Sequence, residues 1–311
     1  MVKVLITGAN GLVGQTLVRK FLIMPEFEFL ATSASECKVK GLNPDRFLQM
    51  DITNREAVVT VFDLFKPEVV IHCAAMTQVD PCEQNPELCD QVNITGVKIV
   101  AKAAEQAGAK FICLSTDFVF DGLKGPYSED DQPNPVSVYG WSKLQGEFIT
   151  HSLRVPWVIV RTILVYGVTQ SMNRSNLVTW VRDSLSQHKP IRVVNDQFRM
   201  PTLVDDLADG IISIIERNKV GIYHLSGPEM ISIYDFALKI AKIFRLDDSL
   251  ITPILSESLN QAGKRPVSTG FVLDKAMDEL DFLPRNIDEG LVLVQNLIHE
   301  FSADPGVRPN C

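Results

Sequence analysis

The glycine-rich turn near the N-terminus constrains this chain more than any other feature of its sequence. In "VKVLITGANGLVGQ" a β-branched apolar run is followed by three glycines at a spacing of three and then by a helical pattern. Glycines permit a tight turn and close backbone approach, and the N-terminus of the following helix attracts a pyrophosphate. A plain turn is the alternative, but a strand, spaced glycines and a helix in this order predict a dinucleotide site. The loop residues predicted to contact the cofactor are Gly8, Asn10, Gly11, Leu12 and Gly14.

Short apolar runs alternate with helical patterns along most of the chain. This alternation predicts an α/β protein with a parallel sheet covered on both faces, as in a Rossmann-type doubly wound fold. The predicted strands are Val2–Thr7, Phe27–Thr32, Phe47–Met50, Val69–Ala75, Lys110–Ser115, Trp157–Thr162 and Gly221–Gly227. The main predicted helices are Arg55–Phe65, Val92–Gly108, Tyr139–Ser152, Ser175–Gln187, Val204–Glu216, Ile233–Phe244 and Asp288–Phe301.

The spacing of the elements changes after Tyr166, which predicts a second, smaller α/β lobe. Residues 1–165 are expected to form the NAD(P)-binding domain, completed by about 202–226. Residues 166–201 and 227–302 are expected to form a C-terminal substrate-binding lobe, and 303–311 a loose tail.

Composition excludes several classes of function. The chain has 311 residues and a formal net charge of −8, which argues against a nucleic acid or an anionic membrane as partner. Its N-terminus enters a strand pattern directly, and no window is long and apolar enough for a membrane span. The six cysteines show neither the spacing of a metal site nor a disulfide framework. We therefore expect a cytoplasmic protein without a metal.

The end of the second predicted strand selects between the two nicotinamide cofactors. An acidic residue there would accept a hydrogen bond from the ribose of NAD, but the first acid after the strand is Glu36. Ser33, Ser35 and Lys38 suit a 2′-phosphate, so NADPH is expected, with NADH as the alternative. Asp51 follows a short strand and is predicted, with Ile52, to lie at the adenine; a turn or helix-capping role for Asp51 is the alternative.

The stretch "VYGWSK" places Tyr139 and Lys143 four residues apart, on one face of a predicted helix. A cation there would stabilise a tyrosinate and lower the pKa of the phenol, which could then donate a proton to a carbonyl oxygen. Such pairs are common on helix surfaces, so the spacing alone leaves both interpretations open.

Four stretches in the right order resemble the extended short-chain dehydrogenase/reductase family. They are the glycine loop, "HCAAMTQVDPCEQNPELCDQVN", "LSTDFVFDG" and "YGWSK". "NDQFRMPT" and "KRP" narrow the resemblance to the dTDP-4-dehydrorhamnose reductases, over nearly the whole chain up to about Phe301.

This resemblance implies roles for residues that spacing alone cannot assign. Tyr139 would protonate the substrate carbonyl oxygen, Lys143 would hold the nicotinamide ribose, and Thr116 would orient the carbonyl. The backbone of Ala74 and Ala75 would lie along the cofactor. Three further expectations are that Asn93 is a helix cap or part of the polar network near the cofactor, that Ser115 is structural, and that Arg161 forms a structural ion pair.

The substrate side departs from the family pattern. Phe118 stands where the family usually has tyrosine, and Leu164 or a neighbour replaces a tryptophan. Arg199 stands where the reductases often carry a small residue, whereas the regulatory β subunit of methionine adenosyltransferase has a similar arginine. Arg199 is expected to bind a diphosphate or to pair with Asp196 or Asp205. Arg265 is expected to hold the nucleotide diphosphate. The residues predicted to bind substrate are Thr116, Asp117, Phe118, Tyr139, Arg199 and Arg265.

The resemblance implies reduction of the 4-keto group of a nucleotide sugar, with dTDP-4-dehydro-L-rhamnose converted to dTDP-L-rhamnose. An epimerase or reductase of another sugar nucleotide is one alternative. An NADP-binding regulatory subunit without catalysis is the other. A homodimer is also expected, although the acidic residue that some relatives use to share a metal between subunits is replaced by Gln15 and Thr16.

Overall fold

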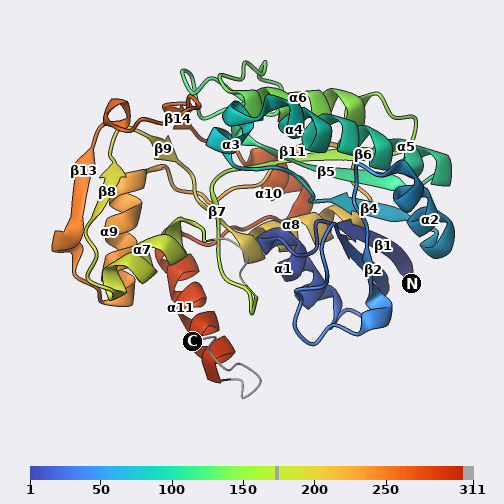
Figure 1. Cartoon of the computed structure of the whole chain (residues 1–311), viewed down its shortest axis with the longest axis horizontal. Coiled ribbons are helices and arrows are strands. Elements are labelled where there is room, and N and C mark those ends of the chain that lie inside the picture. Colours follow the sequence, from blue (N-terminus) through green and yellow to red (C-terminus); the bar gives the residue numbers. More distant parts are fainter. Residues whose placement is uncertain (172–174, 304–311) are drawn as a thin grey trace.

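A seven-stranded parallel sheet forms the centre of the molecule, as the computed structural model of the chain shows for residues 1–171 and 175–303 (Figure 1). The order across the sheet is β11-β6-β5-β4-β1-β2-β3, and every neighbouring pair is parallel. The predicted Rossmann-type sheet is thereby confirmed. Its strands are β1 (Val2–Thr7), β2 (Phe27–Ser33), β3 (Phe47–Gln49), β4 (Val69–His72), β5 (Lys110–Thr116), β6 (Trp157–Thr162) and β11 (Gly221–His224).

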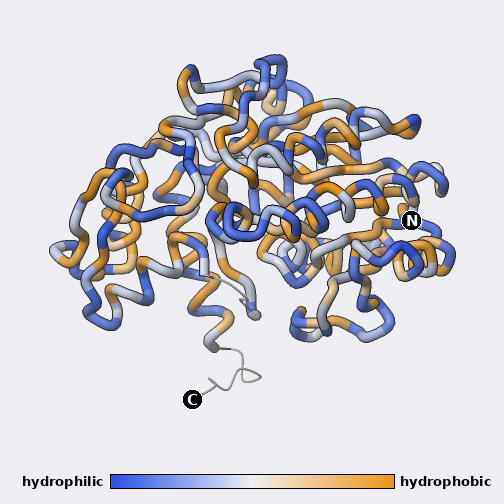
Figure 2. Tube along the Cα trace, turned by 45° about the horizontal axis from the view of Figure 1, so that its top comes forward, coloured by the Kyte–Doolittle hydropathy of each residue, from blue (hydrophilic) through white to orange (hydrophobic). Residues whose placement is uncertain are grey.

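Helices cover both faces of this sheet, because its strands are apolar on both sides. One face packs against α2 (Arg55–Phe65), α5 (Val97–Ala107) and α6 (Val138–His151). The other packs against α1 (Leu12–Phe21), α8 (Val204–Glu216) and α10 (Asp274–Leu280). Figure 2 shows the same arrangement, with apolar colour along the inner strands and hydrophilic colour on many outer loops.

A second hydrophobic core lies beside the sheet, at the left of Figure 1. It is enclosed by α7 (Leu177–Ser186), α9 (Ile233–Phe244) and α11 (Ile287–Ala303). Small sheets complete this region: β7 with β10, β8 with β13, and the three-stranded β12-β9-β14. Their bounds are β7 (Val165–Tyr166), β8 (Ile191–Val194), β9 (Phe198–Arg199), β10 (Thr202–Leu203), β12 (Ile231–Ser232), β13 (Ile251–Ile254) and β14 (Ser268–Thr269).

The sequence prediction missed the helices that precede α5. A nearly continuous helical stretch runs through α4 and a π-helical turn into α5, and so begins before the predicted Val92. Pro86 is the first residue of α4, where a missing N–H costs nothing, so the proline starts a helix rather than breaking one. The remaining elements are α3 (Val79–Gln84), α4 (Pro86–Asp90), the π turn η2 (Gln91–Gly96) and the 3₁₀ turns η1 (Pro44–Arg46), η3 (Asp117–Val119), η4 (Asp248–Leu250) and η5 (Ser256–Ser258).

The predicted division at residue 165 stays a prediction, although β11 does return to the main sheet from the C-terminal half. Of the predicted tail, residue 303 ends α11 and 304–311 lie outside the described residues. Among the described residues, no helix is both long and apolar enough to span a membrane.

Candidate active site

The predicted catalytic residues meet where β5 ends and α6 begins. Thr116 is the last residue of β5, and the turn η3 follows it directly. Ser137 caps α6 by accepting from the Gly140 N–H at 3.1 Å. A Cβ built on Gly140 would lie 2.2 Å from the Phe118 carbonyl oxygen. Only glycine therefore lets the start of α6 approach η3 so closely, which places Tyr139 beside Thr116.

The glycine loop forms a cradle that side chains would fill. Gly8 has φ of +68°, and a Cβ on it would lie 2.6 Å from the Ala74 nitrogen. A Cβ on Gly14 would lie 2.5 Å from the Gly8 carbonyl oxygen. Gly11 is the N-cap of α1, and no side chain caps this helix end. The loop thus offers an open helix N-terminus with Ala74 beside it, which fits a pyrophosphate.

The Asn10 side chain connects this loop to the segment that follows β2 by hydrogen bonds. Its amide group donates to Ser35 Oγ at 3.1 Å and to the Glu36 carbonyl oxygen at 2.8 Å, while its Oδ1 accepts from the Lys38 N–H at 2.9 Å. Ser33 is half-buried, and the side chains of Ser35 and Lys38 are exposed. The predicted phosphate-binding side chains therefore lie next to the glycine loop and face solvent.

Two residues predicted near the cofactor have structural roles. Asp51 accepts from the N–H and hydroxyl of Thr53 at 2.9 and 2.8 Å, which is the turn role left open by the sequence. Asn93 lies within the π turn and does not begin a helix, so the cap interpretation is wrong. Its side chain is fully buried, bonds the N–H and carbonyl of Met76 at 2.8 and 2.9 Å, and donates to Ser142 Oγ at 3.0 Å. Asn93 thus fixes the loop after β4 against α6.

The remaining adenine-side residue packs in the interior. Ile52 is buried in the core between the sheet and α2 and α5, and its Cδ1 lies against Gly96. Ala75 is partly buried in the loop that leaves β4. Both positions flank the carboxyl edge of the sheet.

Tyr139 and Lys143 are buried rather than on the helix surface. Their exposed fractions are 8% and 5%. Burial raises the pKa of Tyr139 well above its usual value, and hydrogen bonding from Thr116 opposes the rise only in part. The expected lowering of this pKa by Lys143 is therefore wrong for the free protein. A phenol that stays protonated is the form required of a proton donor.

Lys143 has no counter-ion in the part of the chain that the structure describes. Among the described residues no hydrogen bond or ion pair involves its ammonium group, and Glu147 one turn further along α6 is bonded to Arg161 instead. The positive charge of Lys143 is close enough to His72 to help lower that imidazole's pKa to about 3, together with burial as the larger cause. A buried cation that no described residue pairs with, next to a buried phenol, is typical of a functional site.

A buried ion pair between Arg161 and Glu147 lies beside the site. Arg161 bonds Glu147 through Nε at 3.0 Å and Nη2 at 2.7 Å, and Ser115 donates to the same carboxylate at 2.5 Å. The two predictions that Ser115 is structural and that Arg161 forms a structural ion pair are confirmed. Together the three residues tie β5 and β6 to α6.

Asp117 and Arg199 face each other inside the protein. Arg199 Nε lies 3.6 Å from Asp117 Oδ2, and its other nitrogens donate to the carbonyls of Phe198, Pro266 and Val267 at 2.7, 2.7 and 3.2 Å. Its side chain is 4% exposed. The expectations that Arg199 binds a diphosphate or pairs with Asp196 or Asp205 are therefore wrong, because every part of its guanidinium is engaged elsewhere. The Phe118 ring lies between this arginine and Tyr139, with centroid distances of 5.6 and 5.7 Å.

Arg265 is engaged by a carboxylate. It forms a bidentate pair with Asp80 on α3, at 2.8 and 2.7 Å, which lowers the pKa of Asp80. In this state the guanidinium of Arg265 is therefore paired within the protein, and its role in holding a diphosphate stays a prediction. The pair nevertheless joins the segment before β14 to the helix that packs on Tyr139.

Several contributing residues were not predicted. Glu83 accepts from the Val138 N–H at 2.8 Å at the start of α6, and Gln15 donates to the carbonyls of Asn10 and Ser171 at 2.9 and 2.8 Å. The Tyr127 hydroxyl donates to Asp121 at 2.7 Å and accepts from the N–H groups of the three residues that follow Asp121. The glycine of the "FDG" stretch is typical of a turn, so the turn after Asp121 had a local sequence signal. The contacts of Glu83 and Gln15 join distant segments and have no local sequence pattern.

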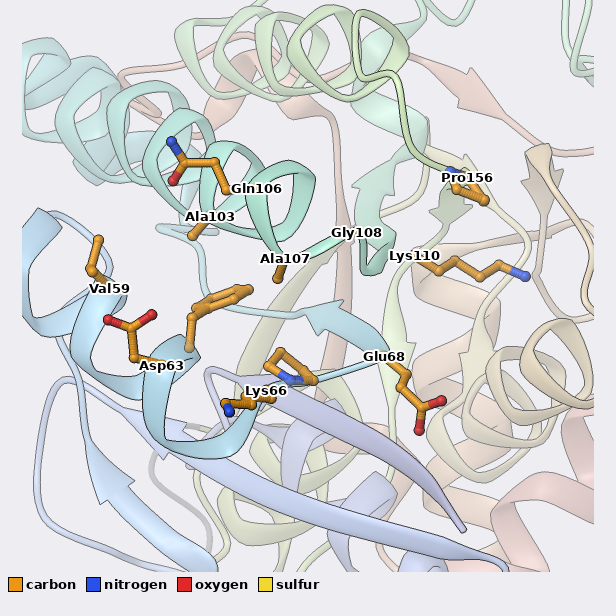
Figure 3. A pocket seen from close by; sticks show the side chains of 12 residues that line it. Val59, Asp63, Lys66, Glu68, Ala103, Gln106, Ala107, Gly108, Lys110 and Pro156 are labelled. Atoms are coloured by element: carbon orange, nitrogen blue, oxygen red, sulfur yellow. The ribbon is translucent and has the colours of Figure 1, made fainter.

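A groove of about 670 Å³ lies at the opposite edge of the sheet, between α2 and α5 (Figure 3). It is lined by side chains such as Val59, Asp63, Ala103 and Gln106, and by Lys110 at the start of β5. No predicted site residue lines it, so it lies apart from the catalytic side chains.

Comparison with known proteins identifies relatives that match most of the chain. The family described as RmlD substrate binding domain matches residues 2–299. A dTDP-4-dehydrorhamnose reductase of Aggregatibacter actinomycetemcomitans is 33% identical over 304 residues, which cover 94% of this chain and 97% of that protein. Subunit beta of methionine adenosyltransferase 2 from Xenopus tropicalis is also 33% identical, over 85% of this chain and 78% of that protein.

A solved structure gives the same fold. The dTDP-4-dehydrorhamnose reductase of Bacillus anthracis, in complex with NADP, is 30% identical, superposes with a TM-score of 0.81, and aligns with 96% of this chain and 100% of that one.

Proposed function

Since this chain belongs to the RmlD substrate binding domain family, we propose that it is an NADPH-dependent reductase of the 4-keto group of a nucleotide sugar. The proposed reaction converts dTDP-4-dehydro-L-rhamnose to dTDP-L-rhamnose, as the name of the reductase from Aggregatibacter actinomycetemcomitans suggests. The NADP complex of the relative from Bacillus anthracis supports the choice of cofactor.

One observation carries the proposal: Lys143 is a buried cation with no counter-ion among residues 1–171 and 175–303, one helical turn from the buried phenol of Tyr139. Stability alone does not explain such a charge, because an unpaired buried ammonium is costly. Hydroxyl groups of a bound ribose would supply its missing acceptors. The cradle formed by Gly8, Gly14 and Ala74 would then hold the pyrophosphate at the N-terminus of α1.

The residues of the chain divide the chemistry among them. When bound, NADPH supplies the hydride that reduces the carbonyl carbon. Tyr139 donates its phenolic proton to the carbonyl oxygen, and the positive charge of Lys143 stabilises the tyrosinate left behind. Thr116 keeps the phenol in place. Solvent then returns a proton to Tyr139 and completes the cycle.

We propose that residues 166–201 and 227–302 form the substrate-binding lobe, over the carboxyl ends of the strands. Phe118 presents an apolar face beside Tyr139, where it would contact the sugar ring. Arg265 can reach a diphosphate only after leaving Asp80. On substrate binding, its guanidinium would therefore exchange the Asp80 carboxylate for the diphosphate of the substrate.

A second candidate function is that of a cofactor-binding subunit of a larger enzyme. The similarity to subunit beta of methionine adenosyltransferase 2 favours it, because the identity equals that to the reductase. The complete Thr116, Tyr139 and Lys143 set favours the reductase.

Turnover distinguishes the two candidates. We expect the purified protein to oxidise NADPH, followed by its near-ultraviolet absorbance, when dTDP-4-dehydrorhamnose is added. Tyr139→Phe should reduce this rate by at least about 100-fold while NADPH still binds, because the phenyl ring keeps the packing and loses the proton. Tight NADPH binding by a wild-type protein that reduces no sugar nucleotide would contradict the proposal and favour the subunit.

We propose a cytoplasmic location, which the free thiols of the described cysteines support, since a reducing compartment preserves them. Homodimer formation stays a prediction; sedimentation of the purified protein would test it.

A further inference from the structure

Asp117 lies between the Thr116 hydroxyl and a buried positive charge. Its Oδ1 accepts from Thr116 Oγ1 at 3.0 Å, whereas its Oδ2 accepts from Thr269 Oγ1 and lies 3.6 Å from Arg199 Nε. Asp117 and Arg199 are 2% and 3% exposed. A carboxylate this deeply buried stays charged only if a cation and hydrogen bonds compensate for lost water.

The positive charge reaches Asp117 from another part of the chain. Arg199 belongs to β9, the central strand of the sheet β12-β9-β14, and it donates to the carbonyls of Phe198, Pro266 and Val267. These contacts fix the guanidinium in position. Thr269 on β14 approaches the same carboxylate, so the small sheet as a whole is docked on the residue that follows Thr116.

The Thr116 hydroxyl has a single proton, and the geometry shows where it goes. The proton points to Asp117, while the oxygen accepts from the Phe118 N–H at 3.2 Å. Tyr139 is a further hydrogen-bonding neighbour of Thr116, and this contact lowers the pKa of the phenol. If Asp117 were protonated, its carboxyl group would accept the hydrogen bond from Thr116 less strongly. The Thr116 hydroxyl could then rotate.

We propose that Arg199 is a positioning residue for the reduction: it holds Asp117 in place as an anion, and the Asp117 carboxylate fixes the Thr116 hydroxyl next to Tyr139. This inference rests on the proposed function. It assigns to Arg199 a role in catalysis without contact with the substrate.

The charged groups around Asp117 determine how its ionisation responds to pH. Arg199 faces it from β9, Tyr139 faces it from α6, and Arg265 acts on Arg199 from the segment before β14. Burial raises the pKa of Asp117, and Arg199 is the largest influence in the other direction. Removing Arg199 therefore moves this pKa further upward.

Kinetics of four variants test the proposal. Arg199→Met should lower kcat by about 10- to 100-fold, with NADPH binding unchanged, and its remaining activity relative to wild type should rise with pH as Asp117 ionises. Arg199→Lys should restore part of the rate because it returns the charge. The double variant Asp117→Asn/Arg199→Met should be no slower than Asp117→Asn alone, since Arg199 acts only through Asp117.

Arg285→Met is the matched control. Arg285 pairs with buried Asp206, whose pKa is likewise raised by burial and lowered by its arginine. This variant should lose stability and keep its kcat. A wild-type pH profile in Arg199→Met, or a double variant whose loss is the product of the two single losses, would overturn the proposal.

A measurement without turnover separates this inference from the proposed function. An aspartate with a raised folded pKa destabilises the protein progressively as pH rises between its unfolded and folded values. The melting temperature of Arg199→Met should therefore fall further below that of wild type at pH 8 than at pH 5. When Asp117 is already replaced by asparagine, adding Arg199→Met should lower the melting temperature by the same amount at both pH values. If the melting-temperature difference does not grow with pH, the Arg199–Asp117 coupling is refuted even in an active enzyme. If the difference grows with pH but the protein shows no turnover, only the reductase proposal is refuted.

Discussion

At the scale of single residues, Tyr139 shows how burial and chemistry act together. The phenol lies among Val79, Cys82 and Cys89 with the Phe118 ring against its edge. Removing water disfavours its charged form, so the pKa rises although Lys143 is one turn away. The proton needed for reduction is therefore retained until a substrate oxygen is ready to receive it.

This burial predicts the alkaline behaviour of the free protein. The ultraviolet difference between wild type and Tyr139→Phe should show no phenolate signal up to about pH 10, the ordinary pKa of tyrosine. Above that pH, wild type should lose stability relative to the variant, because the unfolded chain ionises Tyr139 and the folded chain does not. A phenolate signal near pH 8 would contradict the assignment.

Residue type and family pattern identified the catalytic residues but not their charged neighbours. Tyr139 and Lys143 share a helix face, so their spacing of four residues predicts that they lie close together. Arg199 and Arg265 could be recognised as cations that need anions. Their partners, Asp117 and Asp80, lie on distant segments, and only the folded chain shows that the anions belong to the protein.

At the scale of elements, the close contact between α6 and η3 depends on Gly140. Gly140→Ala should destabilise the protein by about 1–3 kcal/mol, because the new methyl group meets the Phe118 carbonyl at 2.2 Å. Turnover should fall as well, since Tyr139 is the preceding residue. Urea unfolding measures the first effect and NADPH oxidation the second.

Gly146 on the same helix provides the control. Its nearest neighbour to an added Cβ is the Asn93 carbonyl oxygen at 3.5 Å, an ordinary contact. Gly146→Ala should stabilise the protein by about 0.5–1 kcal/mol, because alanine favours the helix interior. Equal effects of the two substitutions would show that helix propensity, and not the approach to η3, determines the outcome.

The strands of the main sheet were predictable because most of them are short runs rich in apolar residues. Val2–Thr7 and Trp157–Thr162 match β1 and β6 at both ends, and Arg55–Phe65 matches α2. The two-residue strands β9, β12 and β14 were not predictable, because their pairing depends on long-range contacts and two residues have no period. The sheet that carries Arg199 was missed for this reason.

At the scale of the whole molecule, two hydrophobic cores are joined through polar contacts near the site. The main sheet and the C-terminal region have separate clusters of buried apolar residues. Asp117 with Arg199, and Asp80 with Arg265, connect η3 and α3 to the segments around β9 and β14. These ion pairs connect the two regions, and the proposed substrate binding would require Arg265 to leave Asp80.

Buried imidazoles set the acid stability of the whole fold. His72 is 1% exposed, its Nδ1 lies 3.0 Å from Thr7 Oγ1, and its pKa is lowered to about 3 by burial and then by Lys143. A base with a lowered folded pKa gives stability that is complete above its unfolded value, about 6.5, and is lost as pH falls toward the folded value. Between pH 7 and pH 5 this histidine should cost about 2 kcal/mol of the free energy of unfolding.

His72→Asn tests this cost, because asparagine cannot ionise. Whatever its stability at pH 7, the variant should lose about 2 kcal/mol less than wild type between pH 7 and pH 5, measured by urea unfolding at both values. The raised carboxylates Asp117 and Asp206 titrate in both proteins, so their contribution cancels in the comparison. His299→Asn serves as the control, since an exposed imidazole is hydrated in either state. Identical losses in wild type and His72→Asn would mean that water reaches His72 when it takes up a proton, and that the core around Thr7 and Lys143 opens in acid before the rest of the fold.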